Sequence, residues 1–108
     1  MAQPDAVIVL VTWPVAEDAG PAATTLVEER LAACVSVLPE MDSIYRWKNA
    51  VESQRERQMI IKTTAPRVNG LMARIKQLHP YDVPEMIVLP VSGGSGAYFE
   101  WLAACTRV

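Results

Sequence analysis

The stretch CVSVLPEMDSIYRWKNAVESQRERQMIIKTT, residues 34–64, decides the fold of this chain. Residues 34–47 are extended in character, KNA supplies a turn, and residues 51–64 return as a second strand, a pattern that predicts a β-hairpin. At a rise of ~3.3 Å per residue, an arm of about 14 residues is roughly 45 Å long. A 100-residue domain has a radius of gyration of only ~13 Å. Even if it bends at Pro39, the hairpin is expected to overhang its own domain.

The segments before the hairpin predict a strand and a helix. Residues 6–12, AVIVLVT, form a continuous apolar and β-branched run, which is typical of a strand covered on both faces. Pro21 is well placed in the first turn of a helix. Apolar residues then recur at spacings of three and four and predict one helical stripe: Ala23, Leu26, Val27, Leu31 and Cys34.

The segments after the hairpin predict a helix, a strand and a final helix. Thr64 is a candidate helix cap, and Pro66 belongs in the first turn that follows. Residues 83–91, VPEMIVLPV, are typical of a buried strand, and SGGSG is a loop. The second helix has the apolar stripe Val68, Leu71, Met72, Ile75 and Leu78, and the last helix has one side made of Tyr98, Trp101, Leu102 and Cys105.

This order of elements predicts an α+β fold, an α/β sandwich of ferredoxin-like βαββαβ topology with an extended hairpin and a C-terminal helix. Neither an internal repeat nor a linker divides the 108 residues, so residues 1–108 are predicted to form a single domain. The free edges of an overhanging hairpin invite aggregation unless another chain covers them. We therefore expect the hairpin to complete the sheet of a neighbouring subunit.

Composition argues against several partners. Ten Lys and Arg residues are scattered among twelve Asp and Glu residues, with a net charge of −2, so no nucleic acid is expected. No apolar run approaches ~18 residues, so no membrane-spanning helix is expected. The start, MAQPDAVIVLVTWP, has no basic region before its apolar stretch, which favours cytoplasmic residence over secretion. Cys34 and Cys105 lack CxxC spacing and are predicted to be buried thiols in a reducing compartment.

No enzyme signature is present in the sequence. Its one histidine, His79, has no serine arranged as its nucleophile, so a Ser-His-Asp hydrolase is not expected. SGGSG lacks the GK[ST] of a phosphate-binding loop. The strands AVIVLVT and QMIIKTT lack the stacking aromatics of RNA-recognition domains, and WPVAEDAGP lacks the arginine of an acylphosphatase loop. We predict no catalytic activity and no required cofactor.

The pieces LVEERLAACVSVLPEMDSIYRWKNAVE, QMIIKTT, LHPYDVPEMIVLPV and AYFEWL resemble the CutA family of divalent-cation tolerance proteins in order and spacing. The resemblance runs from Val7 to Leu102. It implies a ferredoxin-like homotrimer whose long hairpins wrap adjacent subunits, similar in build to PII signalling proteins. It also implies a cytoplasmic role in heavy-metal tolerance, with copper binding in some members.

Two departures from the copper-linked members affect the metal expectation. Those members carry a cysteine where this chain has Val11 and a further histidine where it has Leu78, so that only His79 remains of three potential ligands. A tight copper or zinc site needs three or four ligands. Three copies of His79 around a threefold axis are one way to supply them. The alternative is structural: His79 ends a helix before Pro80 and bonds the last helical carbonyls.

Acidic and aromatic residues near His79 leave further alternatives open. Asp82 and Glu85 are candidate oxygen ligands, or are solvated, or Glu85 pairs with Lys62 or Arg46. The aromatics Tyr45, Trp47, Tyr81 and Trp101 are typical of a core or an interface. A hairpin ending in YRW beside a neighbour's HPY loop also predicts a cleft between subunits, which is a usual place for a ligand. Its predicted lining is Trp47, Lys62, Tyr81 and Glu85.

Two functions follow as hypotheses. The first is a trimeric cytoplasmic divalent-cation tolerance protein that responds to or binds heavy-metal ions such as copper. The second is a PII-like signalling or scaffold trimer that binds a small ligand or a partner protein without catalysis.

Overall fold

The computed structural model describes residues 5–108, which form one sheet, three α-helices and a short 3-10 helix. The elements in chain order are β1 (Ala6–Pro14), α1 (Gly20–Glu28), β2 (Cys34–Trp47), β3 (Ala50–Thr64), η1 (Ala65–Arg67), α2 (Val68–Leu78), β4 (Ile87–Pro90) and α3 (Gly96–Thr106). The sheet is antiparallel, with strand order β2-β3-β1-β4. The predicted α+β fold of βαββαβ topology with a terminal helix is confirmed.

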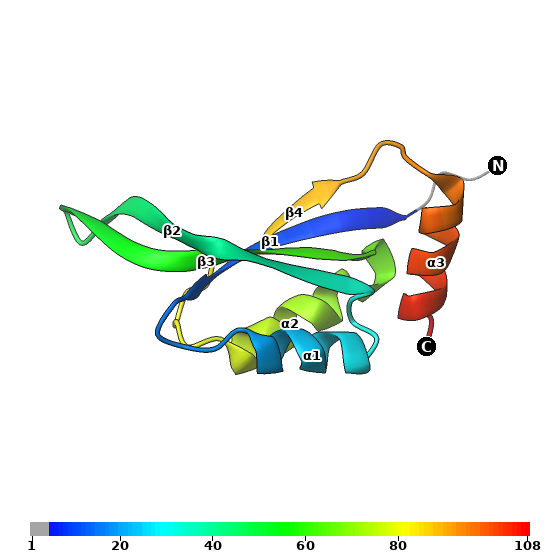
Figure 1. The fold of residues 1–108 in the computed structure, drawn as a ribbon, viewed down its shortest axis with the longest axis horizontal. Coiled ribbons are helices and arrows are strands. Elements are labelled where there is room, and N and C mark those ends of the chain that lie inside the picture. The colour runs from blue at the N-terminus through cyan, green and yellow to red at the C-terminus, as the bar shows by residue number, and fades with distance from the viewer. Residues whose placement is uncertain (1–4) are drawn as a thin grey trace.

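Helices α1 and α2 cover one face of the sheet, and α3 stands at the end of the sheet (Figure 1). Alternate residues of β1 and β3 point toward the two helices, and Val9, Val11 and Ile61 are completely buried. Leu26 of α1 and Leu71 of α2 pack against them in the same cluster. A smaller cluster holds α3 to the sheet and consists of Ala6, Ala33 and Leu102. Burial of these apolar side chains is the main contribution to the stability of this face.

Strands β2 and β3 form a long hairpin that projects beyond α1 and α2 (Figure 1). Lys48 and Asn49 make its turn with φ angles of 49° and 66°, the left-handed conformations that a tight hairpin turn requires. Strand β1 pairs with β3 only as far as the Pro14–Glu56 rung, so the outer part of the hairpin has no third strand. The structure extends 49 Å along its longest axis, against 25 and 23 Å across it. The predicted overhang is confirmed.

The second face of the sheet carries no helix, and we call it the helix-free face. The register places Ile8 and Leu10 of β1, Ile60 of β3, and Leu89 and Ile87 of β4 on this face. Ile87 and Leu89 are 47% and 42% exposed. Within one chain the part of this face formed by these residues is therefore apolar and only partly covered.

The prediction of a buried strand over 83–91 was wrong in length and in burial. Strand β4 has four residues, Ile87–Pro90, and lies at the edge of the sheet, paired only with β1. All four of its residues are exposed. The apolar run reflects the sheet face and edge on which it lies, and periodicity alone does not separate an edge strand from a central one.

The predicted helical stripe also ended too late. Helix α1 stops at Glu28, and Arg30 adopts a φ of 60°, which turns the chain out of the helix. Leu31 is buried from the connecting loop, whereas Cys34 already belongs to β2. Val27 is 40% exposed. A spacing of three and four residues continued by chance beyond the end of the helix.

The last helix buries only part of its predicted side. Leu102 is buried, and Cys105 packs against the small α3 cluster. Tyr98 and Trp101 stay 40% and 46% exposed, with ring centroids 5.4 Å apart. Both cysteines are free and only partly buried, which corrects the prediction of buried thiols. None of the helices in residues 5–108 combines the length and apolar character needed to cross a bilayer.

Candidate functional site

His79 lies immediately after α2 and is 7% exposed. Its Nε2 is 2.7 Å from the carbonyl oxygen of Thr12 on β1, and its Nδ1 is 3.0 Å from the amide nitrogen of Tyr81. A carbonyl oxygen only accepts and an amide N–H only donates, so Nε2 carries the proton and Nδ1 accepts. Both ring nitrogens therefore have partners inside the chain.

The surroundings of His79 join three segments. The imidazole lies between the rings of Trp13 and Tyr81, with centroid distances of 4.4 and 4.8 Å. The backbone N–H of His79 donates to the carbonyl of Ile75 and closes the last turn of α2. The expectation that the imidazole bonds the last helical carbonyls was therefore wrong: the ring bonds Thr12 of β1. A metal ion at Nδ1, the one ring lone pair, has to displace the Tyr81 amide.

Tyr81 connects the His79 loop to a buried acid. Its hydroxyl donates to Glu56 Oε2 at 2.8 Å, and Glu56 is only 6% exposed. Burial, and then the hydrogen bond to the Glu56 carboxylate, raise the pKa of Tyr81 above its usual value. Sequence reasoning missed Glu56, because the polar half of residues 51–64 gave no sign of which acid would be covered. Its position across the sheet from Pro14 places it where the sheet body begins.

Lys62 and Glu85 have polar partners but do not pair with each other. Lys62 Nζ donates to Ser36 Oγ at 3.0 Å and lies 3.7 Å from Cys34 Sγ. Glu85 Oε2 accepts a hydrogen bond of 3.3 Å from Gln58 Nε2. Within residues 5–108 the ion pairs are made by Arg55, Arg57 and Arg74 alone. Neither proposed partner of Glu85, Lys62 or Arg46, therefore contacts it as an ion pair.

Lys62 and the residues that bind Tyr81 and Glu85 lie on one face of β3. Glu56, Gln58 and Lys62 are even-numbered residues of β3, with Ile60 between the last two, so they share the helix-free face, and we call them the polar row. Tyr81 contacts its first member and Glu85 its second. Three of the four predicted pocket residues are thus brought to one strand face within a single chain.

Trp47 is not brought to that row. It is the last residue of β2, paired with Ala50 beside the hairpin turn, and it is 51% exposed. The length of β3 separates it from Lys62. Tyr45, on the same arm, donates a 3.4 Å hydrogen bond to Gln54 across the hairpin. One chain alone does not form the predicted pocket.

The donors of one chain do not fit a bound copper ion. Residues 5–108 contain no group of three or more His, Cys, Asp or Glu side chains arranged to hold a metal. Val11 is fully buried in the core and Leu78 packs against the same core, so neither position supplies a donor. Both nitrogens of His79 are already bonded.

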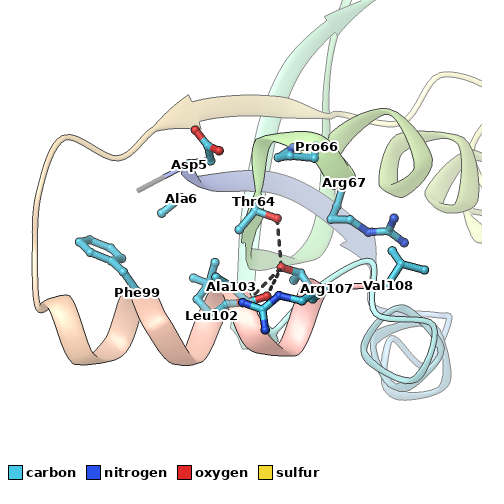
Figure 2. A pocket seen from close by; sticks show the side chains of 11 residues that line it. Asp5, Ala6, Thr64, Pro66, Arg67, Phe99, Leu102, Ala103, Arg107 and Val108 are labelled. Atoms are coloured by element: carbon cyan, nitrogen blue, oxygen red, sulfur yellow. Dashed lines mark hydrogen bonds between the residues drawn. The ribbon is translucent and has the colours of Figure 1, made fainter. Parts of the chain in front are cut away.

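A pocket of about 330 Å³ lies away from the polar row, where α3 meets η1 and the start of β1 (Figure 2). Its wall includes Phe99 and Leu102, and Arg67 and Arg107 also line it. Thr64, predicted as a helix cap, is the N-cap residue of η1, but its side chain makes no capping hydrogen bond. Its hydroxyl is 3.0 Å from that of Thr106, and this bond ties β3 to α3. The pocket is thus a seam between α3 and the sheet that includes no predicted site residue.

The comparison with known families agrees with the fold. The model of the CutA1 divalent ion tolerance protein family matches residues 7–105. The chain belongs to the CutA1 family. The divalent-cation tolerance protein CutA of Pectobacterium atrosepticum is 48% identical over 103 residues, covering 95% of this chain and 94% of that protein. The chloroplastic protein CutA of Arabidopsis thaliana is 43% identical, covering 94% of this chain and 56% of that protein.

Solved CutA structures share the whole fold. The divalent cation tolerance protein of Thermus thermophilus superposes with a TM-score of 0.91 at 44% identity, covering 94% of this chain and 99% of that one. CutA1 from Oryza sativa gives a TM-score of 0.89 at 41% identity, covering 94% of each chain. The family resemblance seen in the sequence is therefore confirmed, and with it a family role in tolerance of divalent cations.

Proposed function

We propose that this CutA1 protein is a homotrimeric divalent-cation tolerance protein that responds to or binds heavy-metal ions such as copper. Family membership supports the tolerance role, because its bacterial relatives carry that name. The observation that carries the proposed assembly is the overhanging hairpin beside a helix-free sheet face with exposed apolar side chains.

Three features of the single chain support its assembly with further copies. The hairpin beyond the Pro14–Glu56 rung has two strands and no cover. β2 and β4 are the two edges of the sheet and present unpaired backbone groups. Large apolar side chains stay exposed at the hairpin end, with Ile44 at 73% and Val51 at 68%. Free edges and apolar patches of this kind are normally covered by another chain.

The same assembly supplies the proposed inter-subunit pocket. Trp47 at the end of one subunit's hairpin would lie beside Lys62, Tyr81 and Glu85 of the next subunit. Lys62 lies on the helix-free face of β3, and Tyr81 and Glu85 bond to Glu56 and Gln58 on the same face, which supports this. The exposure of Trp47 supports it too. We further propose that residues 1–108 act as one domain without catalytic activity or a resident cofactor, that the protein works in the cytoplasm, and that it binds neither nucleic acid nor membrane.

For metal binding we propose His79, in several copies gathered by the assembly, as the candidate ligand. Because one chain does not fit a copper ion, we assign it no metal-dependent step. Metal binding at His79 requires loss of the Tyr81 amide bond to Nδ1. Metal binding and local rearrangement of the 79–81 turn are therefore coupled in this proposal.

The alternative is a PII-like signalling or scaffold trimer that binds a small ligand or a partner protein without catalysis. The engagement of both His79 nitrogens favours it. So does the lack of a group of three or more metal-ligating side chains in the described part of the chain.

Calorimetric titration of metal-stripped protein with Cu(II) separates the two functions. Wild type is compared with His79→Ala, and with Cys34→Ser, which removes the thiol beside the polar row. A micromolar or tighter site that depends on His79 supports the metal-binding function. Weak binding without saturation in all three proteins contradicts it and supports the scaffold alternative. Circular dichroism and sedimentation of His79→Ala are recorded in parallel, because the substitution removes a buried ring.

A further inference from the structure

Lys62 has no counter-ion among the residues that the structure describes. The ion pairs of residues 5–108 leave it out, and its polar contacts are a hydroxyl and a thiol, Ser36 Oγ at 3.0 Å and Cys34 Sγ at 3.7 Å. By contrast, Arg55 bonds both Glu40 and Asp42. An ammonium group without a carboxylate is expected to attract one.

The apolar surroundings of Lys62 make an unpaired charge there unfavourable once the face is covered. Across the sheet its neighbour is Ile8, and the next residue along the same rung is Leu89. Ser36 lies opposite Ile60 on the next rung of that face. A charged group flanked by apolar side chains loses hydration when the face is covered, and this loss has to be offset by a charge of opposite sign.

The hydrogen-bond donors of Lys62 and Ser36 lie close together. An ammonium group has three N–H donors, and Lys62 directs two of them toward Ser36 and Cys34. Ser36 Oγ accepts from Lys62 and also lies 3.9 Å from Cys34 Sγ; with the thiol as donor in that contact, the Ser36 O–H can donate to another acceptor. A charged and a neutral donor thus lie 3.0 Å apart on two half-buried residues of the helix-free face. Two oxygens of one anion can accept from both, and such charge-assisted hydrogen bonds are the strong kind.

We propose that Lys62 and Ser36 form a binding site for a small oxyanion, a carboxylate or a phosphate, on the helix-free face. An apolar body on the anion would lie along Ile8 and Leu89, beside the ammonium group. This inference deepens the inter-subunit pocket proposed above, because Lys62 lines it, and in that sense rests on the proposed function. It gives the pocket a ligand class that differs from a metal cation.

Titration with inorganic phosphate and with butyrate tests the site, followed by calorimetry and by amide chemical shifts in a chloride buffer. We expect saturable binding of at least one of them to wild type, with shifts at Ser36 and Lys62. Lys62→Gln is expected to weaken binding about tenfold or more, the size expected for loss of a charged hydrogen bond. Ser36→Ala weakens it less, and Lys62→Arg retains part of it. Lys76→Gln, which removes a lysine of α2 outside the site, leaves binding unchanged.

Three outcomes overturn the inference. The first is that neither anion shows saturable binding to wild type. The second is that Lys62→Gln binds the anion as tightly as wild type does. The third is that wild type binds butylammonium as tightly as butyrate. The last comparison uses wild type alone, so it holds even if a variant fails to fold. Sedimentation of the same samples separates this result from the proposed assembly. The donors come from one chain, so a monomer that binds the anion contradicts the trimer only, and a trimer that does not bind it contradicts the anion site only.

Discussion

The two faces of β3 differ in how far one chain completes them. On one face Met59, Ile61 and Thr63 are almost wholly buried beneath the helices. On the other face Ile60 and Lys62 are only partly covered, and the neighbouring strand β4 leaves its apolar side chains exposed. The first face is a hydrophobic core that one chain buries by itself. The second has the features of an interface, and the proposed assembly and ligand site both lie there.

The largest expected effect comes from a substitution in the core beneath the helices. Ile61→Ala removes a fully buried side chain and is expected to lower the free energy of unfolding by about 2–5 kcal/mol. Ile87→Ala, on the helix-free face, is the matched control. Since Ile87 is 47% exposed within the chain, its truncation should reduce assembly more than the stability of the subunit. Urea unfolding at several protein concentrations measures both. Equal losses that do not depend on concentration would contradict the difference between the faces.

His79 lies at the border of the two faces, and its truncation should have the next largest effect. His79→Ala removes the bonds to the Thr12 carbonyl and the Tyr81 amide and leaves a space beside Trp13. We expect a loss of about 2–3 kcal/mol in unfolding free energy without any metal present. The same denaturant experiment in the presence of a chelator measures it. A variant as stable as wild type would show that His79 is not a structural residue.

The end of α2 at His79, the long hairpin and the order of helices and strands were predictable, because each depends on a local sequence pattern. Pro80 after His79 marks the end of a helix, and the length of residues 34–64 exceeds the size of the domain. The partners of His79 were not predictable, because Thr12 lies 67 residues away in the sequence. The coverage of Glu56 by Tyr81, and the pairing of Lys62 with Ser36, likewise depend on register and on loop placement. Strand β4 was misjudged because an apolar run does not reveal whether the sheet continues beyond it.

A smaller effect is expected from alkaline pH at the Tyr81–Glu56 bond. The folded state raises the pKa of Tyr81 above its ordinary value of about 10, so the folded protein holds this proton more tightly than the unfolded chain does. The resulting stabilisation is fully present below about pH 10 and is lost as the pH rises beyond it. Tyr81→Phe should remove this part of the pH dependence. Unfolding free energies measured from about pH 8 to about pH 11.5 test it, and an unchanged profile in the variant would refute the assignment.

The smallest expected effect concerns the hairpin turn, at the end farthest from the core. Asn49 has a φ of 66°, which glycine adopts without strain and a β-branched residue resists. Asn49→Gly should change the unfolding free energy by less than about 0.5 kcal/mol, whereas Asn49→Val should cost about 1–2 kcal/mol. Thermal unfolding of the two variants measures the difference. If both behave alike, the turn geometry is wrong.

Sedimentation equilibrium of the wild-type chain at micromolar concentration tests the central claim most directly, since it measures whether further copies of the chain associate to cover the helix-free face. We expect a single species with three times the mass of one chain. A species with the mass of one chain throughout the concentration range would contradict the assembly and the pocket between subunits.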